Sequence, residues 1–277
     1  MRIKQHIPNA ITCCNLLCGC LALLVSDNAY MALMFILLAA LFDFFDGFAA
    51  RALRAYSPIG KDLDSLADMI SFGVAPAIVG FKYMKSLAAT FLGDKDWLDC
   101  LFSDSAIISD KRGMILLFAA CLLPLFIALF SALRLAKFNN DKRQTENFIG
   151  LATPACTILY VSMVALLRVK LAEASTLYLQ GEGQTPISIW YLWLPAITAP
   201  ILSYLLVSEI AMFSMKLKNL SWQDNSTRFI FLMIVVVEIA MTIIGNFSVP
   251  FMILSVITTY IIINILLALK PNKLRDK

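Results

Sequence analysis

Charged residues and histidine are scarce in this sequence. Of its 277 residues, 15% are charged and 60% are hydrophobic, whereas a soluble domain of this length would carry roughly 25% charged residues. The cysteines Cys13, Cys14, Cys18 and Cys20 lack the polar flanking loops and the histidines expected at a zinc site, since the single histidine is His6. We interpret them as small residues that let helices approach, and the seven cysteines show no disulfide framework. The composition excludes a soluble globular protein and indicates an integral membrane protein.

Long apolar runs fill most of the chain. Runs of about 20 apolar residues are typical of transmembrane helices. The first run follows a basic N-terminus but is as long as a full span, so no cleavable signal peptide is predicted. We therefore expect an all-α, polytopic membrane helical bundle that forms a single domain over residues 1–277. About eight spans are predicted, at residues 8–26, 30–52, 63–84, 113–136, 151–170, 188–212, 228–246 and 248–269.

Lysine and arginine are unevenly distributed between the predicted loops. If the N-terminus is cytoplasmic, most of the 23 Lys and Arg residues fall on the cytoplasmic side, as the positive-inside rule requires. An even number of spans then places both termini in the cytoplasm. The short turn "AYSPIG" at residues 55–60 lies on the same side, so the protein is expected in the cytoplasmic membrane with this turn facing the cytoplasm.

Four aspartates flank this turn: Asp43, Asp46, Asp64 and Asp68. An aspartate near the centre of a transmembrane helix costs about 2.5–3.5 kcal/mol, so such residues are candidates for function. Asp43 and Asp46 are three residues apart and share one face of the second predicted helix, while Asp64 and Asp68 are four apart on the third. A helix–turn–helix hairpin brings the two pairs together.

Four carboxylates held close together would repel one another unless one or two cations lie between them. Oxygen ligands at this density suit magnesium or manganese, and magnesium leaves coordination positions open for substrate phosphates. Arg51 lies beside the acids together with the small residues Gly47, Ala49 and Ala50, and arginine binds phosphate with two parallel hydrogen bonds. The segment therefore predicts a metal-bound diphosphate ligand at the membrane surface. The alternative is a polar seam that only joins helices.

The same residues form a recognisable pattern, Asp-x2-Asp-Gly-x2-Ala-Arg-x8-Gly-x3-Asp-x3-Asp, without any departure over residues 43–68. It resembles the signature of the CDP-alcohol phosphotransferases, which transfer a substituted phosphate from a CDP-linked lipid or alcohol to a hydroxyl and release CMP. The resemblance implies a site for two divalent ions, Mg²⁺ or Mn²⁺, held by Asp43, Asp46, Asp64 and Asp68. It also implies that CDP is bound by Gly47, Ala50, Arg51 and Gly60.

Further segments resemble one branch of that family, the bacterial and archaeal phosphatidylserine synthases. They are "IPNAITCCNLLCG" at 7–19, "DMISFGVAPA" at 68–77, "LRLAKFN" at 133–139, "FIGLATPA" at 148–155 and "LLVSEIAMFSMK" at 205–216. The resemblance implies that CDP-diacylglycerol and L-serine are the substrates and that phosphatidylserine and CMP are the products. It assigns Asp68 as the general base that takes the serine hydroxyl proton, and it implies a homodimer among membrane lipids.

The residues that would recognise the acceptor are less sharply indicated. A zwitterion such as serine needs a cation for its carboxylate, and Arg134 is the candidate, together with Lys137 and Asn139 at the end of the fourth predicted span. Positive-inside topology alone would also explain basic residues there. The first predicted span carries three polar residues, Asn9, Thr12 and Asn15. They would contact the nucleotide, support the aspartates or join helices.

Three other functions fit part of the pattern. A related enzyme would use another acceptor, such as inositol phosphate or glycerol phosphate, and would need more than one basic residue near the site. A divalent-cation transporter would place its acids near the bilayer midplane, whereas these acids flank a turn. A catalytically inactive scaffold would not need the complete motif. Nothing in the sequence indicates a nucleic-acid partner.

Overall fold

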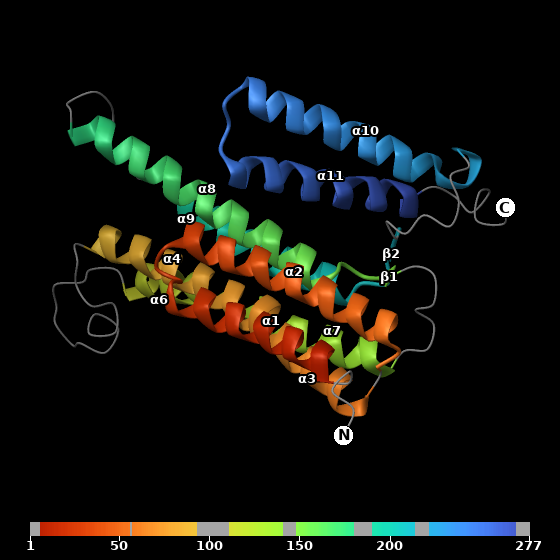
Figure 1. Ribbon diagram of the computed structural model, residues 1–277. Helices are drawn as coiled ribbons and strands as arrows, with labels where there is room; N and C mark the ends of the chain where they lie inside the picture. Colours follow the sequence, from red (N-terminus) through yellow and green to blue (C-terminus); the bar gives the residue numbers. More distant parts are fainter. Residues whose placement is uncertain are drawn as a thin grey trace.

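The computed structural model describes residues 6–55, 57–92, 111–140, 148–179, 190–213 and 222–269. These residues form a helical bundle with one two-residue strand pair (Figure 1). The elements in chain order are α1 (His6–Leu24), α2 (Ala29–Leu53), α3 (Pro58–Asp68), a π-helical segment (Met69–Val74), α4 (Ala75–Leu92), α6 (Lys111–Leu122), α7 (Leu125–Asn140), β1 (Phe148–Ile149), α8 (Thr153–Leu179), α9 (Trp190–Val207), β2 (Ala211–Met212), α10 (Trp222–Ile244) and α11 (Val249–Leu269).

Within these described ranges the helices form eight segments that are long and apolar enough to cross a membrane, which confirms the predicted number. The third segment begins at Pro58, five residues before the predicted boundary at 63. Pro58 can start a helix because its fixed backbone angle suits the first helical position, and the Ser57 hydroxyl caps this helix by accepting from the Gly60 amide at 3.0 Å. The fourth segment, Ile115–Asn140, consists of α6 and α7. The two helices meet at Pro124, which lacks the amide proton that a continuous helix needs.

Small residues let the central helices approach closely. α1 packs along α2, and it also contacts α3 and the π-helical segment. At Gly19 of α1, an added Cβ would lie 2.4 Å from the Ser71 hydroxyl, and at Gly80 of α4 it would lie 2.5 Å from the Tyr160 hydroxyl. The Ser71 hydroxyl in turn donates to the backbone carbonyl of Asn15 at 3.0 Å. Close backbone approach of this kind stabilises helix pairs in lipid, where no hydrophobic driving force joins them.

A short strand pair closes the bundle beside the N-terminus of α8. Phe148 pairs with Met212 and Ile149 with Ala211 in antiparallel register. Gly150 follows with a positive φ of 76°, and an added Cβ would lie 2.6 Å from the Leu206 carbonyl, so only glycine fits there without strain. The chain thereby enters α8 directly after the ladder, which fixes the position of the first residues of α8.

The opposite end of the bundle carries an exposed ion pair. The Lys82 ammonium lies 2.8 Å from the Asp27 carboxylate, in the connection between α1 and α2. The hydrogen bond from Lys82 lowers the pKa of Asp27. Nearby, the Arg168 guanidinium lies 5.4 Å from the ring centre of Tyr83. These contacts join α4 and α8 to the α1–α2 connection, far along the helices from the four aspartates.

The last two helices form a hairpin at the side of the bundle, drawn in blue at the top of Figure 1. α11 packs against α8, and α10 packs against α11. A polar contact crosses this hairpin, because the Thr259 hydroxyl donates to the Glu238 carboxylate at 2.5 Å. Two hydrogen bonds hold the residue after β2 to α11: the Phe213 amide donates to Asn264 at 2.7 Å, and its carbonyl accepts from Tyr260 at 3.0 Å.

Candidate active site

The site begins with the turn between α2 and α3. α2 ends where Arg54 takes a left-handed conformation, with φ 51° and ψ 41°, and the Ala55 amide donates back to the Ala50 carbonyl at 3.0 Å. After two further residues the Ser57 cap starts α3 in the reverse direction. The hairpin therefore places the acids near the end of α2 beside those of α3.

Three of the four aspartates form a cluster. One carboxylate oxygen from each of Asp43, Asp64 and Asp68 lies within 4.8 Å of the others. The fourth, Asp46, is buried and accepts a hydrogen bond from the Thr12 hydroxyl at 2.7 Å. A set of carboxylate oxygens at this spacing matches what hard divalent cations require. The donor set therefore fits Mg²⁺ or Mn²⁺.

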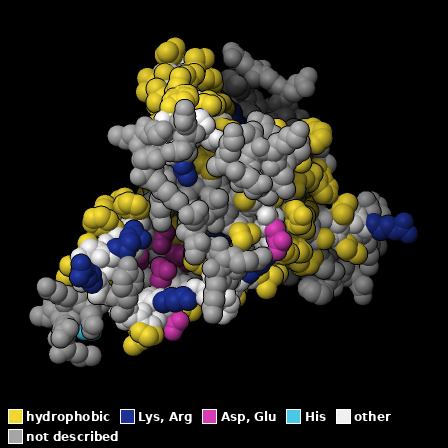
Figure 2. Space-filling model, turned by 90° about the vertical axis from the view of Figure 1, so that its right-hand side faces the viewer, with side chains coloured by type: hydrophobic (Ala, Val, Ile, Leu, Met, Phe, Trp, Pro, Cys, Tyr) yellow, Lys and Arg dark blue, Asp and Glu magenta, His cyan; other side chains and the backbone are white. Residues whose placement is uncertain are grey.

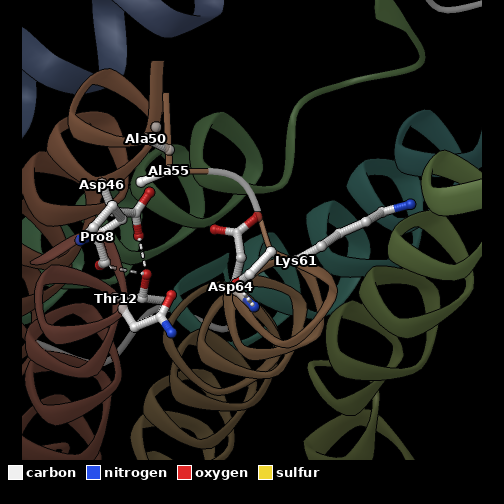
Figure 3. Close-up of a pocket in the computed structure, with 11 residues that line it drawn as sticks. Pro8, Thr12, Asp46, Ala50, Ala55, Lys61 and Asp64 are labelled. Atoms are coloured by element: carbon white, nitrogen blue, oxygen red, sulfur yellow. Dashed lines mark hydrogen bonds between the residues drawn. The ribbon is translucent and has the colours of Figure 1, made fainter. Parts of the chain in front are cut away.

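A cavity of about 200 Å³ lies directly beside the cluster. Figure 2 shows acidic side chains recessed on one face of the molecule, with Lys and Arg side chains around them. In the close-up, Asp46 and Asp64 face this cavity from opposite sides, and Lys61 extends away from it toward α7 (Figure 3). The residues that line the cavity are Pro8, Asn9, Thr12, Asp46, Gly47, Ala50, Ala55, Ser57, Gly60, Lys61 and Asp64.

The structure places the predicted CDP-binding residues in or beside this cavity. Gly47, Ala50 and Gly60 line it. Arg51 lies one turn after Gly47, and its guanidinium is 3.6 Å from the position that a Cβ on Gly47 would occupy. At Gly60 an added Cβ would lie 2.9 Å from the Asn9 side-chain oxygen, so a larger residue would narrow the cavity and push Asn9 away. A guanidinium next to small residues provides a cation and room for a phosphate-bearing ligand.

The three polar residues of α1 all turn toward the aspartate hairpin. Thr12 donates to Asp46, and Asn15 donates from its amide to Asp68 at 3.1 Å. Asn9 lies against Gly60. Their spacing places them on one face of the helix. α1 therefore orients two of the acids and forms one wall of the cavity.

The predicted acceptor residues lie in two different environments. Arg134 is buried, with 8% of its surface exposed, and donates to the Thr153 hydroxyl at 2.8 Å. Its guanidinium interacts electrostatically with Asp68. Lys137 is exposed and lies 3.6 Å from Glu209 in an ion pair. The structure thus brings Arg134 to the aspartates and leaves Lys137 at the surface.

Asn139 connects the end of α7 to α3. Its amide donates to the Ser65 hydroxyl at 2.8 Å, and its backbone carbonyl accepts from the Lys61 ammonium at 3.2 Å. These bonds hold α3 against α7 one turn away from Asp64 and Asp68. The Lys61 contact also explains why this lysine points out of the cavity in Figure 3.

Several residues at the site were not identified from the sequence. Thr153 accepts a hydrogen bond from Arg134, and Ser131 lies one helical turn before Arg134 on α7. Pro8, Ala55 and Lys61 line the cavity. Ser131 could have been found, because it precedes Arg134 by three residues and so shares its helical face. Thr153 lies within the segment "FIGLATPA", but nothing in the sequence connects it to Arg134. Pro8, Ala55 and Lys61 carry no chemistry that would single them out.

Comparison with known proteins identifies relatives of this chain. A family model described as CDP-alcohol phosphatidyltransferase matches residues 5–201. Three relatives are each named CDP-diacylglycerol–serine O-phosphatidyltransferase. The Bacillus subtilis protein is 34% identical over 54% of this chain and 70% of its own length. The Mycobacterium bovis protein is 32% identical over 76% of this chain, and the Methanocaldococcus jannaschii protein is 32% identical over 58% of it. These alignments span less than two thirds of the latter two relatives, 62% and 61%.

Proposed function

Because the chain belongs to the CDP-alcohol phosphatidyltransferase family, we propose that it transfers the phosphatidyl group of CDP-diacylglycerol to the hydroxyl of L-serine. The products are phosphatidylserine and CMP. The observation that carries this proposal is the convergence of Asp43, Asp64 and Asp68 beside a cavity lined by the small residues of the same motif. Relatives that bear the name of this activity support serine as the acceptor.

Asp43, Asp46, Asp64 and Asp68 would hold the divalent metal, with two ions as the proposed number. The three clustered carboxylates supply the oxygen donors that Mg²⁺ and Mn²⁺ prefer. When bound, such ions neutralise the diphosphate and stabilise charge that develops during displacement. Asp46 also accepts from Thr12, so its orientation is fixed by α1.

The remaining steps belong to residues of the chain. Gly47, Ala50, Arg51 and Gly60 bind the CDP moiety, with Arg51 as the cation for its phosphates. Asn9 and Thr12 complete the nucleotide side of the cavity, and Asn15 orients Asp68. This arrangement holds the phosphorus of the phosphatidyl group within reach of an acceptor that approaches from the side of Asp68.

Asp68 acts as the general base. An unassisted hydroxyl is a weak nucleophile, so a base within hydrogen-bond reach is needed. The serine oxygen forms a bond to the phosphorus of the phosphatidyl group as its proton passes to Asp68. The bond from that phosphorus to the bridging oxygen breaks, and CMP leaves with the electron pair. Arg134, Lys137 and Asn139 are proposed to bind the acceptor, and Arg134 interacts electrostatically with Asp68.

The direct test is an activity measurement on the purified protein. CDP-diacylglycerol, Mg²⁺ or Mn²⁺ and one of several hydroxyl acceptors are supplied, and CMP release is followed. We expect release with L-serine, and much less with glycerol phosphate or inositol phosphate. Release that depends on a phosphorylated acceptor instead would overturn serine as the substrate but not the reaction type. No release with any acceptor would contradict the proposed activity as a whole.

We further propose that the protein lies in the cytoplasmic membrane as a homodimer, with both termini and the site facing the cytoplasm. The excess of Lys and Arg on one side of the predicted spans supports this orientation. In a cysteine-free background, single cysteines at Ser57 and Asn140 should react with an impermeant thiol reagent added from the cytoplasmic side. Cysteines at Asp27 and Asn246 should react from the other side. The reverse labelling pattern would contradict this orientation, because the site would then face away from the cytoplasm. A separate measurement tests the homodimer: a molecular mass in detergent that corresponds to one chain would contradict it.

A further inference from the structure

Three buried polar atoms on α1 and α7 have no hydrogen-bond partner among the described residues. They are the side-chain oxygen of Asn15, the hydroxyl of Ser131 and Nε of Arg134. Asn15 and Ser131 have no exposed surface, and Arg134 is 8% exposed. A buried polar atom without a partner costs about 1–3 kcal/mol. Three such atoms, two of them on side chains that interact with Asp68, therefore require an explanation.

Two of the three side chains interact with Asp68, and they come from different helices, α1 and α7. Asn15 of α1 donates its amide to Asp68, which leaves its oxygen free. Arg134 of α7 interacts electrostatically with the same carboxylate, while its Nη1 is used by Thr153. Ser131 precedes Arg134 by one helical turn and so lies on the same face of α7. Asp68 thus interacts with two side chains that carry one free acceptor and one free donor, and the Ser131 hydroxyl, which can do either, lies on the same face of α7 as Arg134.

The π-helical segment after Asp68 brings these residues together. It begins at Met69, and its Gly73 faces α7 so closely that an added Cβ would lie 3.2 Å from the Ser131 Cβ. The Thr157 hydroxyl donates to the Phe72 carbonyl in the same segment, which ties it to α8. π-helical insertions occur frequently at functional sites. Here the insertion lets α7 approach the helix that carries Asp68.

This cluster is separate from the nucleotide side of the site. Ser131 and Arg134 do not line the cavity that contains Gly47 and Gly60, while Asp64 does and Asp68 lies one turn further along α3. The three unpaired atoms therefore belong to residues outside the lining of that cavity, and two of these residues interact with Asp68. A nucleophile that is deprotonated by Asp68 would lie beside them.

We propose that Asn15, Ser131 and Arg134 form the acceptor subsite and recognise an amino acid by hydrogen bonds to its carboxylate and its ammonium group. This inference rests on the proposed phosphatidyl transfer. Arg134 Nε and the Ser131 hydroxyl donate to the acceptor's carboxylate, and the Asn15 oxygen accepts from its ammonium group. The hydroxyl of the bound amino acid is then left for Asp68. The unpaired donors and acceptor match a zwitterion with a side-chain hydroxyl, and the single guanidinium of the cluster matches one carboxylate.

The subsite also distinguishes among the residues proposed for acceptor binding. Lys137 is paired with Glu209 at the surface, and the Asn139 amide is used by Ser65. Both lie beyond Arg134 toward the end of α7, so they would contact an acceptor on its way in. Arg134 and Ser131 would contact it in the position from which it reacts.

The test compares L-serine with L-serinamide, which has the same hydroxyl and ammonium group but no carboxylate. In Arg134→Gln the KM for L-serine should rise about 100-fold, and in Ser131→Ala about 10-fold, since hydrogen bonds to charged groups are the stronger ones. The KM for CDP-diacylglycerol should change less than about twofold in both variants. The preference for serine over serinamide should largely disappear in Arg134→Gln. Lys170→Gln, which removes an exposed cation near the other end of α8, is the matched control and should retain it.

The outcomes separate this inference from the proposed activity. If the unmodified protein releases no CMP with L-serine, the proposed function fails before any variant is examined. If it does, but Arg134→Gln and Ser131→Ala keep the serine-to-serinamide preference, the acceptor subsite is elsewhere. A proportional rise in the KM of both substrates would likewise contradict the inference, because it would indicate a structural role. If Arg134→Gln shows no cooperative thermal unfolding, Arg134→Lys and Ser131→Ala give the same comparison with the charge or the packing retained.

Discussion

Acidic side chains lie among apolar helices in two regions of this molecule, and their surroundings differ. Around α2 and α3, Asp43, Asp64 and Asp68 place oxygens within 4.8 Å of one another, and α1 and α7 add further polar groups. In the α10–α11 hairpin at the side of the bundle (Figure 1), the Glu238 carboxylate has one hydrogen-bond partner among the residues that the structure describes, Thr259 of the neighbouring helix. One carboxylate oxygen of Glu238 is buried without a partner among the described residues.

The difference shows what identifies a reactive site in a membrane protein. Every ionisable residue in a span is costly and is by default a candidate for function. A single acid with a single partner can be explained by the joining of two helices, since interhelical hydrogen bonds contribute about 0.6 kcal/mol on average. Several acids that come from two helices, meet beside a cavity and interact with polar groups of two further helices, α1 and α7, cannot be explained in that way. The family match, which covers residues 5–201 and not the hairpin, agrees with this distinction.

The largest effect is expected from removal of the metal. Because the clustered carboxylates are proposed to bind divalent ions, EDTA should abolish CMP release, and added Mg²⁺ or Mn²⁺ should restore it. Asp43→Asn should weaken the metal-dependent binding of CDP-diacylglycerol, followed by thermal shift or calorimetry, together with turnover. Full turnover in excess chelator would show that the cluster is no metal site and would make it comparable to the Glu238 region.

The next effect concerns Asp68. Asp68→Asn keeps the size of the side chain and removes its basicity, and general-base assistance is worth about 10²–10⁴-fold. We expect turnover to fall by that factor, while metal-dependent binding of CDP-diacylglycerol is retained because three carboxylates remain.

Two results would contradict this role of Asp68. Near-normal turnover in Asp68→Asn would mean that another group takes the proton. A loss of metal binding as severe as that of Asp43→Asn, measured side by side, would mean that Asp68 serves mainly as a ligand.

Much of the fold could be predicted because apolar run length and turn residues determine it locally. The sequence predicts eight spans, and the described part of the chain contains eight. The hairpin that joins the aspartate pairs follows from their spacing and from the turn at Ser57 and Pro58. The third span begins five residues before the boundary that the sequence predicts. Ser57 and Pro58 are typical turn residues, but the same two residues also cap and begin a helix.

The acceptor side of the site could not be predicted to the same extent. Arg134, Lys137 and Asn139 lie in one short segment, and sequence does not give the rotation of α7 that buries the first and exposes the second. Ser131 is an ordinary residue for a membrane helix until the π-helical segment is known to approach it. The free oxygen of Asn15 depends on a hydrogen bond between residues 53 positions apart. Contacts between helices decide these features, and apolar periodicity does not specify them.

The smallest effect on turnover is expected from substitutions in the α10–α11 hairpin. They test whether Glu238, unlike the clustered aspartates, serves only to join two helices. Glu238→Gln keeps a side-chain oxygen that can accept from Thr259, so turnover and the KM of both substrates should stay within about twofold. Glu238→Ala and Thr259→Val each remove the hydrogen bond between the two helices. A double-mutant cycle of thermal or denaturant unfolding in detergent measures their coupling free energy, which should be about 0.6 kcal/mol and at most about 1.7 kcal/mol. Asp46→Asn, measured in the same assay, provides the contrast with an acid of the cluster and should lower turnover far more. If Glu238→Gln lowers turnover to a similar degree while its unfolding is unchanged, the hairpin acts on the reaction, and a single acid with a single partner would then have to count as part of the functional machinery.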